Sequence, residues 1–330
     1  MIFGIDTHLL FRKDFNEVTS EYRTAIMGLA MMSVMLFHQY FTSIIPFNAF
    51  HNFGNWGVDV FLFLSGMGLV RSLARNPLPV YYKRRFKRII PSCILCGTTK
   101  YIIFISLGSS VAILKDSLNL GWWSLASLDL WFISTILILY AISPLLNNLL
   151  HKWPYITSSI ITITMFVNGL TLRPFIGNEW ASPLGILSWT IERLPIFAAG
   201  MFISIRKDWI EDKIPYSIPF LLAAFGIKIL DKFGFLLHGR TYSFIALIFG
   251  MPALIVVNIY VLKITPNILK QFIIFLGENS LELYLVHEFI FWSLKVIFVD
   301  TNSWVLLTTG ILLSCLAAYM CKLAINKCLP

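Results

Sequence analysis

Long apolar runs separated by short polar connections make up almost the whole chain. A bilayer core of about 30 Å requires roughly 20 apolar residues per helix, and ten runs meet that requirement. They cover residues 24–45, 55–73, 89–112, 129–149, 155–172, 186–205, 214–230, 241–262, 272–299 and 304–326. The pattern predicts an all-α fold, a polytopic membrane bundle of about ten transmembrane helices, with the ninth broken near Gly277.

The composition excludes a soluble globular protein. Hydrophobic residues make up 57% of the chain and charged residues 13%, well outside the range of soluble domains. We expect one integral membrane domain over 24–326, between a cytoplasmic N-terminal segment, 1–23, and a cytoplasmic tail, 327–330. Asp6 and Asp14 argue against a secretory signal, so the first apolar run is expected to remain in the mature protein.

The basic residues indicate the orientation of the bundle. If both termini face the cytoplasm, most of the 26 Lys and Arg residues fall in inner connections, as the positive-inside rule requires. Topology therefore accounts for the net charge of +9, and no nucleic-acid partner is expected.

The five cysteines lie in or beside apolar segments, which argues against a disulfide framework. Cys93 and Cys96 have the spacing of a redox or metal pair, but no second pair accompanies them. We expect these thiols to act as small packing residues, and we expect neither a metal site nor a permanently bound cofactor.

His38 lies deep in the first apolar run, 15 residues after Arg23. At 1.5 Å per residue this is about 22 Å along a helix, past the membrane midplane and toward the outside. Asp59 begins the second helix on the same side and could orient and charge-stabilise the imidazole. The alternatives are an interhelical hydrogen bond for His38 and a helix cap near Gly57 for Asp59.

A dense basic stretch precedes the third helix, from Lys83 to Arg88. Its ordinary meaning is a topological anchor that touches anionic lipid. Arg85 and Arg88 are three residues apart and share a helix face, so two guanidinium groups could hold a phosphorylated ligand there. Spacing alone leaves both interpretations open.

Two further groups of polar residues lie within apolar segments. Glu192 and Arg193 are adjacent and cannot both face lipid, so we expect them to line a polar cavity. A second titratable cluster in the ninth segment comprises Glu282, Tyr284, His287 and Glu288. A structural salt-bridge network is the alternative for both groups. Ser65 precedes Gly66 in the second helix, where close packing of small residues and a place beside the cavity are both open.

Taken in order, these pieces resemble the acyltransferase-3 family of integral membrane acyltransferases. The resemblance spans most of the chain and rests on five motifs. They are Val34–His38; Gly57–Gly66; Arg85–Pro91; Leu130–Phe132 with Tyr140 and Pro144–Leu145; and Leu276–Gly277 with Ser280–Leu281 and Tyr284–His287. Each motif is weak alone, but five in the right order are specific.

The resemblance implies an essential histidine at His38 and a functional arginine pair at Arg85 and Arg88. It also implies a cytoplasmic acyl-CoA donor, such as acetyl-CoA, and O-acetylation of a glycan or lipid-linked saccharide outside a bacterial plasma membrane. One departure concerns the arginine that the family usually has eleven positions before the histidine, where this chain has Met27. Arg23, one turn earlier, or the cluster that includes Arg84 would have to replace it.

Acyl transfer to a hydroxyl requires a proton acceptor, and His38 suits that role as general base or as a covalent acyl relay. Two other functions remain open. Buried ionisable residues also line the pathways of small-solute and proton-coupled transporters, and a catalytically silent relative could act in polysaccharide assembly. Membrane lipid is an expected partner, and a homo-oligomer is a further candidate.

Overall fold

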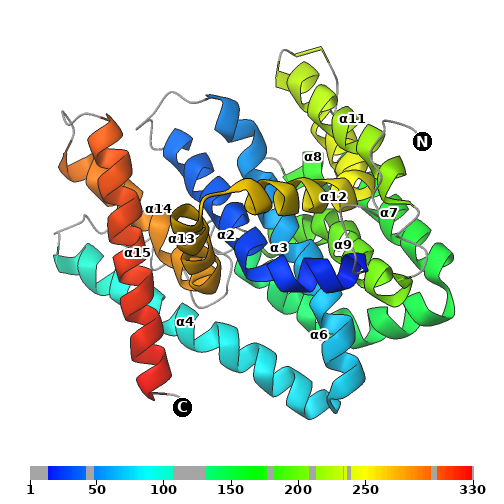
Figure 1. Ribbon diagram of the computed structural model, residues 1–330, viewed down its shortest axis with the longest axis horizontal. Helices are drawn as coiled ribbons and strands as arrows, with labels where there is room; N and C mark the ends of the chain where they lie inside the picture. Colours follow the sequence, from blue (N-terminus) through cyan, green and yellow to red (C-terminus); the bar gives the residue numbers. More distant parts are fainter. Residues whose placement is uncertain are drawn as a thin grey trace.

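The computed structural model describes residues 14–41, 48–106, 131–176, 182–207, 213–232, 234–235, 239–298 and 303–328, and every regular element there is a helix (Figure 1). The helices are α2 (Phe15–Phe41), α3 (Asn48–Arg75), α4 (Leu78–Ser106), α6 (Trp131–Lys152), α7 (Pro154–Leu170), α8 (Leu172–Ile176), α9 (Pro183–Ile205), α11 (Ile214–Lys232), α12 (Gly239–Ile264), α13 (Asn267–Glu278), α14 (Ser280–Ile297) and α15 (Ser303–Cys328). The predicted all-α class is confirmed.

Within the described ranges, 7 helices are long and apolar enough to cross a membrane. They correspond to seven of the ten predicted segments, and the polytopic helical bundle is confirmed. The remaining predicted segments are 24–45, 89–112 and 272–299. The first two extend beyond the described ends of α2 and α4, and the third is divided between α13 and α14.

The division of the ninth segment falls at Asn279, two residues after the predicted position. The Asn279 backbone N–H and the side-chain Nδ2 both donate to the carbonyl of Phe275, at 3.2 and 2.7 Å, which closes α13 before α14 begins. A Cβ on Gly277 would collide with the carbonyl oxygen of Thr24, and a Cβ on Gly28 with that of Ile273. Glycine at these two positions therefore lets α13 pack against α2 at backbone contact.

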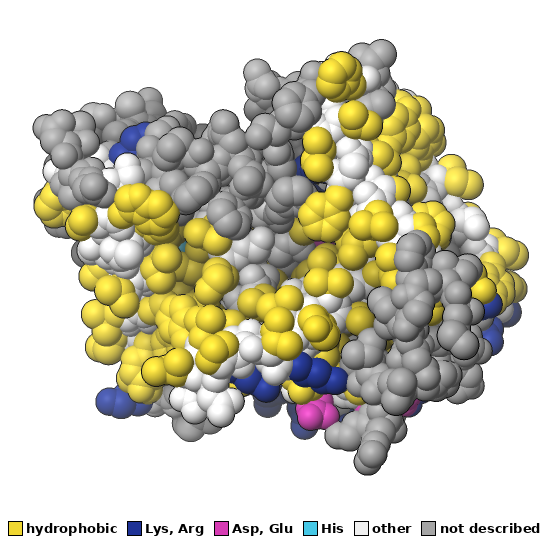
Figure 2. All heavy atoms as spheres, turned by 45° about the horizontal axis from the view of Figure 1, so that its top comes forward, with side chains coloured by type: hydrophobic (Ala, Val, Ile, Leu, Met, Phe, Trp, Pro, Cys, Tyr) yellow, Lys and Arg dark blue, Asp and Glu magenta, His cyan; other side chains and the backbone are white. Residues whose placement is uncertain are grey.

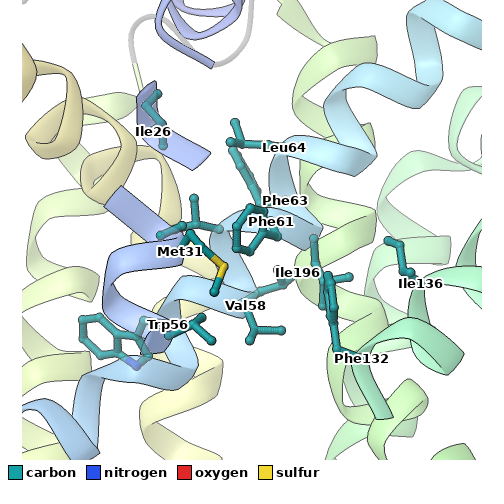
Figure 3. Packing of buried hydrophobic residues seen from close by; sticks show 14 of the residues in the cluster. Ile26, Met31, Trp56, Val58, Phe61, Phe63, Leu64, Phe132, Ile136 and Ile196 are labelled. Carbon is teal, nitrogen blue, oxygen red and sulfur yellow. The ribbon is translucent and has the colours of Figure 1, made fainter. Parts of the chain in front are cut away.

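The core is centred on α3, which packs between α2 and α9. Figure 3 shows side chains from these helices and from α6 meeting in one apolar cluster. The labelled members are Ile26, Met31, Trp56, Val58, Phe61, Phe63, Leu64, Phe132, Ile136 and Ile196. Gly66 and Gly200 bring α3 and α9 together, because a Cβ on either would meet a backbone carbonyl of the other helix.

The outer surface of the bundle is apolar. Large hydrophobic side chains stand fully outward, among them Phe175 and Ile268, which are 82% and 83% exposed. In Figure 2 hydrophobic side chains cover the middle of the visible face, and Lys and Arg gather along its lower margin. Contiguous exposed apolar surface of this extent would be a liability in water, whereas it suits a protein surrounded by lipid.

The close contact between α3 and α9 predicts that Gly200→Ala lowers thermal stability. The added methyl would meet the carbonyl oxygen of Phe63, and overpacking of this kind costs about 1–3 kcal/mol. Gly226→Ala on α11 is the matched control, since no atom of the described residues lies within 4 Å of its Cβ position and alanine favours the helix. Thermal unfolding in detergent would contradict this packing if both variants melted at the wild-type temperature.

Candidate functional site

His38 and His287 form one site, although 249 positions separate them. His38 lies in the last turn of α2 and His287 lies within α14. Nδ1 of His38 is 2.6 Å from Nε2 of His287, and the ring centroids are 4.7 Å apart. His287 is fully buried, while the side chain of His38 retains 15% of its exposure. The structure thus joins two polar groups that the sequence placed in separate segments.

Hydrogen bonding assigns the tautomers of this pair. Nδ1 of His287 lies 2.8 Å from the carbonyl oxygen of Leu283 and 3.0 Å from that of Tyr284. Carbonyl oxygens only accept, so Nδ1 of His287 carries the hydrogen, and in the neutral ring Nε2 is an acceptor. His38 must then donate from its own Nδ1. This leaves a lone pair on Nε2 of His38, the nitrogen that faces away from His287.

Glu288 faces Nε2 of His38. Its Oε2 is 3.7 Å from Nε2 of His38, and its side chain is 37% exposed. A carboxylate at this distance stabilises an imidazolium once Nε2 has taken up a proton. The sequence grouped Glu288 with His287 but gave no indication that it faces His38, because that contact depends on how α14 is rotated against α2.

Aromatic rings surround the histidine pair. Phe37 and Phe291 contact the two imidazoles edge-on, with centroids 5.1 Å from His38 and 6.1 Å from His287. Tyr284, predicted to line the cavity, lies with its ring 6.0 Å from that of His287 and 5.0 Å from that of Phe132. An apolar wall of this kind lowers the local dielectric and strengthens the charge interactions within the site.

Asp59 has a different partner from the one expected. Its Oδ1 accepts a hydrogen bond from Nη1 of Arg193 at 2.6 Å, and both side chains are buried. The guanidinium also lies over the rings of Phe244, Trp189 and Trp131, at 4.7, 5.7 and 5.8 Å. The expectation that Asp59 orients His38 is corrected: a fully buried carboxylate takes the nearest buried cation, which α9 supplies.

Glu192 and Arg193 each form an ion pair with a different residue. Glu192 accepts from Nη1 of Arg173 at 2.5 Å, while Arg193 binds Asp59. The two residues line one small cleft, in a set that also includes Asn55, Trp56, Asp59, Lys228, Ser243 and Phe244. Arg173 was missed as a participant because it directly follows the predicted segment 155–172 and so falls in a connection. The arrangement is the structural ion-pair network that the sequence left as an alternative.

Ser65 is half-buried on α3, next to the glycine that contacts α9. In the described part of the chain no hydrogen bond or ion pair joins it to the histidine pair, and its neighbourhood fits the packing role of Gly66.

The basic stretch on α4 is divided by burial. Arg84 and Arg88 are exposed, whereas Arg85 is half-buried with its guanidinium 5.8 Å from the ring of Tyr81 and 5.7 Å from that of Tyr140. Burial raises the pKa of the Tyr81 phenol to about 12. That hydroxyl is therefore neutral at physiological pH and supplies no negative charge to Arg85.

Arg23 of α2 joins this group from the opposite side. Its Nη1 lies where a side chain on Gly68 of α3 would begin, and the charges of Arg85 and Arg71 act on it. Arg71 is fixed by Ser20 and the carbonyl of Asn16, at 2.9 and 3.0 Å.

In the described ranges no carboxylate pairs with Arg23 or Arg85, and the buried Nε of Arg85 has no hydrogen-bond partner. We call Arg23, Arg71 and Arg85 the arginine cluster; its uncompensated charge favours an anion.

Comparison with known families assigns the chain. The model of the acyltransferase domain matches residues 25–323, nearly the full length. The chain belongs to the acyltransferase-3 family. No curated protein and no solved structure matches it.

The protein is therefore a membrane acyltransferase, and the resemblance in the sequence motifs is confirmed. The matched region contains the histidine pair and two members of the arginine cluster, Arg71 and Arg85, while Arg23 lies two residues before it. In this acyltransferase we expect the buried pair of Asp59 and Arg193 to stabilise the fold, since each charge lies against an opposite charge.

Charge removal at Asp59 or Arg193 should destabilise the acyltransferase. Asp59→Asn leaves Arg193 buried without a counter-charge, at a cost of about 3–5 kcal/mol. The double variant Asp59→Asn, Arg193→Met removes both charges and should cost less than the sum of the two single changes. Unfolding in detergent measures the stability of Asp59→Asn, of Arg193→Met and of the double variant. Strictly additive losses would show that the two side chains do not stabilise each other.

Proposed function

We propose that this acyltransferase moves an acyl group, most simply acetyl, from cytoplasmic acyl-CoA to a hydroxyl of a glycan or lipid-linked saccharide outside the membrane. The observation that carries the proposal is the hydrogen bond between His38 and His287, in which Nδ1 of His38 donates and Nε2 keeps its lone pair as a base. A residual exposure of 15% at His38 supports access from an acceptor.

The chemistry assigns one role to each group. Nε2 of His38 removes the proton of the acceptor hydroxyl as its oxygen attacks the thioester carbonyl. The carbon–sulfur bond then breaks, and the imidazolium returns the proton to the departing CoA thiolate. Glu288 stabilises the imidazolium between these two steps. A covalent acyl-histidine route would use the same nitrogen as nucleophile.

The arginine cluster is the proposed donor site. CoA carries several phosphate charges, and guanidinium groups bind phosphate through paired hydrogen bonds. The unpartnered Nε of Arg85 and the nearby charge of Arg23 support binding at this point. Arg84 and Arg88 are exposed beside it and would attract the anion on approach. In this proposal Arg23 takes the role of the arginine that the family usually has at the position of Met27.

The proposed topology has both termini in the cytoplasm of a bacterial cell and the protein in its plasma membrane. The positive-inside distribution of Lys and Arg supports this orientation. The donor then enters from the side of the arginine cluster, and the acceptor reaches His38 from the opposite side.

Replacing His38 by Ala should abolish acyl transfer while the protein remains folded. His151→Ala is the matched control, because His151 is exposed at the end of α6 and its ring contacts the carbonyl of Asn147, far along the chain from the histidine pair. Transfer of a radiolabelled acetyl group to membrane glycans in reconstituted vesicles is the measurement. Wild-type transfer by the His38→Ala protein would refute the assignment of the base.

Removing the arginine cluster should impair donor binding more than turnover. We expect Arg23→Ala and Arg85→Ala each to raise KM for acetyl-CoA about tenfold or more, as for a lost charge-assisted contact of about 1.5–3 kcal/mol. Arg75→Ala, an exposed arginine at the end of α3, serves as control. A KM unchanged in both cluster variants would place the donor elsewhere.

A further inference from the structure

Glu282 is a buried carboxylate that the reaction described above does not use. It lies in the first turn of α14 and is 2% exposed. Oε1 accepts a hydrogen bond from the hydroxyl of Ser92 on α4 at 2.9 Å. Oε2 is buried and has no hydrogen-bond partner among the described residues. Burial of an acceptor without a donor is costly, so this oxygen calls for an explanation.

Its location is between the two halves of the proposed reaction centre. Along α4, Ser92 follows Arg88 by four residues, about 6 Å. Along α14, His287 follows Glu282 by five residues, about 7.5 Å. The predicted topology has the third and ninth segments, which contain α4 and α14, cross the membrane in the same direction. The contact between Ser92 and Glu282 therefore lies between the arginines and the histidine pair.

A second acceptor lies one turn away, at the break between α13 and α14. Asn279 is 2% exposed, and its Oδ1 is likewise buried without a partner in the described ranges. Its Nδ2 already donates to Phe275, so the orientation of the amide leaves the oxygen free. Residues 279–282 thus contain two acceptor atoms, Oδ1 of Asn279 and Oε2 of Glu282, that have no donor in the described ranges.

We propose that Glu282, assisted by Asn279, is a positioning residue for the pantetheine arm of the acyl-CoA donor. This inference rests on the proposed function. The arm joins the phosphates to the thioester, and its two secondary amides each present one N–H donor. A chain held by phosphates at the arginine cluster and reaching His38 with its thioester must pass this depth. Unused acceptors there complement amide donors, and the carboxylate makes the stronger, charge-assisted bond.

The test distinguishes binding of the pantetheine arm from binding of the nucleotide. Affinities of CoA and of adenosine 3′,5′-bisphosphate, which lacks the arm, are measured for the purified protein in nanodiscs. Glu282→Leu should weaken CoA about tenfold or more and leave the bisphosphate unchanged. Glu282→Gln keeps the shape and an acceptor oxygen, so it should weaken CoA about threefold to tenfold and remains informative if the leucine variant does not fold.

Matched controls make the outcomes distinct. Glu278→Gln changes an exposed carboxylate four residues earlier and should alter neither affinity, whereas Arg85→Ala should weaken both ligands. Equal effects of the Glu282 variants on both ligands, or no effect on either, would overturn the positioning role. Failure of the wild-type protein to bind CoA would instead overturn the proposed function itself.

Discussion

The hydrogen bond between His38 and His287 is the interaction on which the rest of the site depends. It can form only because α14 lies beside α2, and α13 holds it there through backbone contact at Gly28 and Gly277. Deep packing of a broken helix against the first helix thus sets the distance between two imidazoles. The carbonyls of α14 then fix the proton on His287, which in turn fixes the proton on His38. The backbone geometry of α2, α13 and α14 thus determines which nitrogen of His38 can act as a base.

A single physical rule distinguishes the structural charges from the functional ones. In a low-dielectric interior a charge must be paired or must have a ligand. Asp59 with Arg193, and Glu192 with Arg173, form ion pairs that link α9 to α3 and α8. The arginine cluster and Glu282 do not find such partners within the described residues. The unpaired positive charge of the arginine cluster supports our proposal of a donor with an anionic end. The unpartnered oxygen of Glu282 supports our proposal that the arm of this donor carries amide groups.

The sequence predicted the helical class, most of the spans, the break in the ninth segment and the family, because these follow from apolar length, local breakers and motif order. It did not predict the partners of Asp59 and His38. Partner choice depends on how each helix is rotated against its neighbours, which hydropathy does not encode. One signal was present: His287 lies 17 residues after Lys270, about 25 Å along the chain if helical, a depth close to that of His38.

A double-mutant cycle of acyl transfer over His38→Ala and His287→Ala tests the central claim most directly, with each protein first shown to be folded in detergent. If His287 acts only by orienting and polarising His38, its removal alone should slow transfer by about 100-fold or more. The double variant should then be no slower than His38→Ala alone, since residues that act as a unit are not additive. Transfer near the wild-type rate in His287→Ala, or losses that multiply in the double variant, would contradict the account.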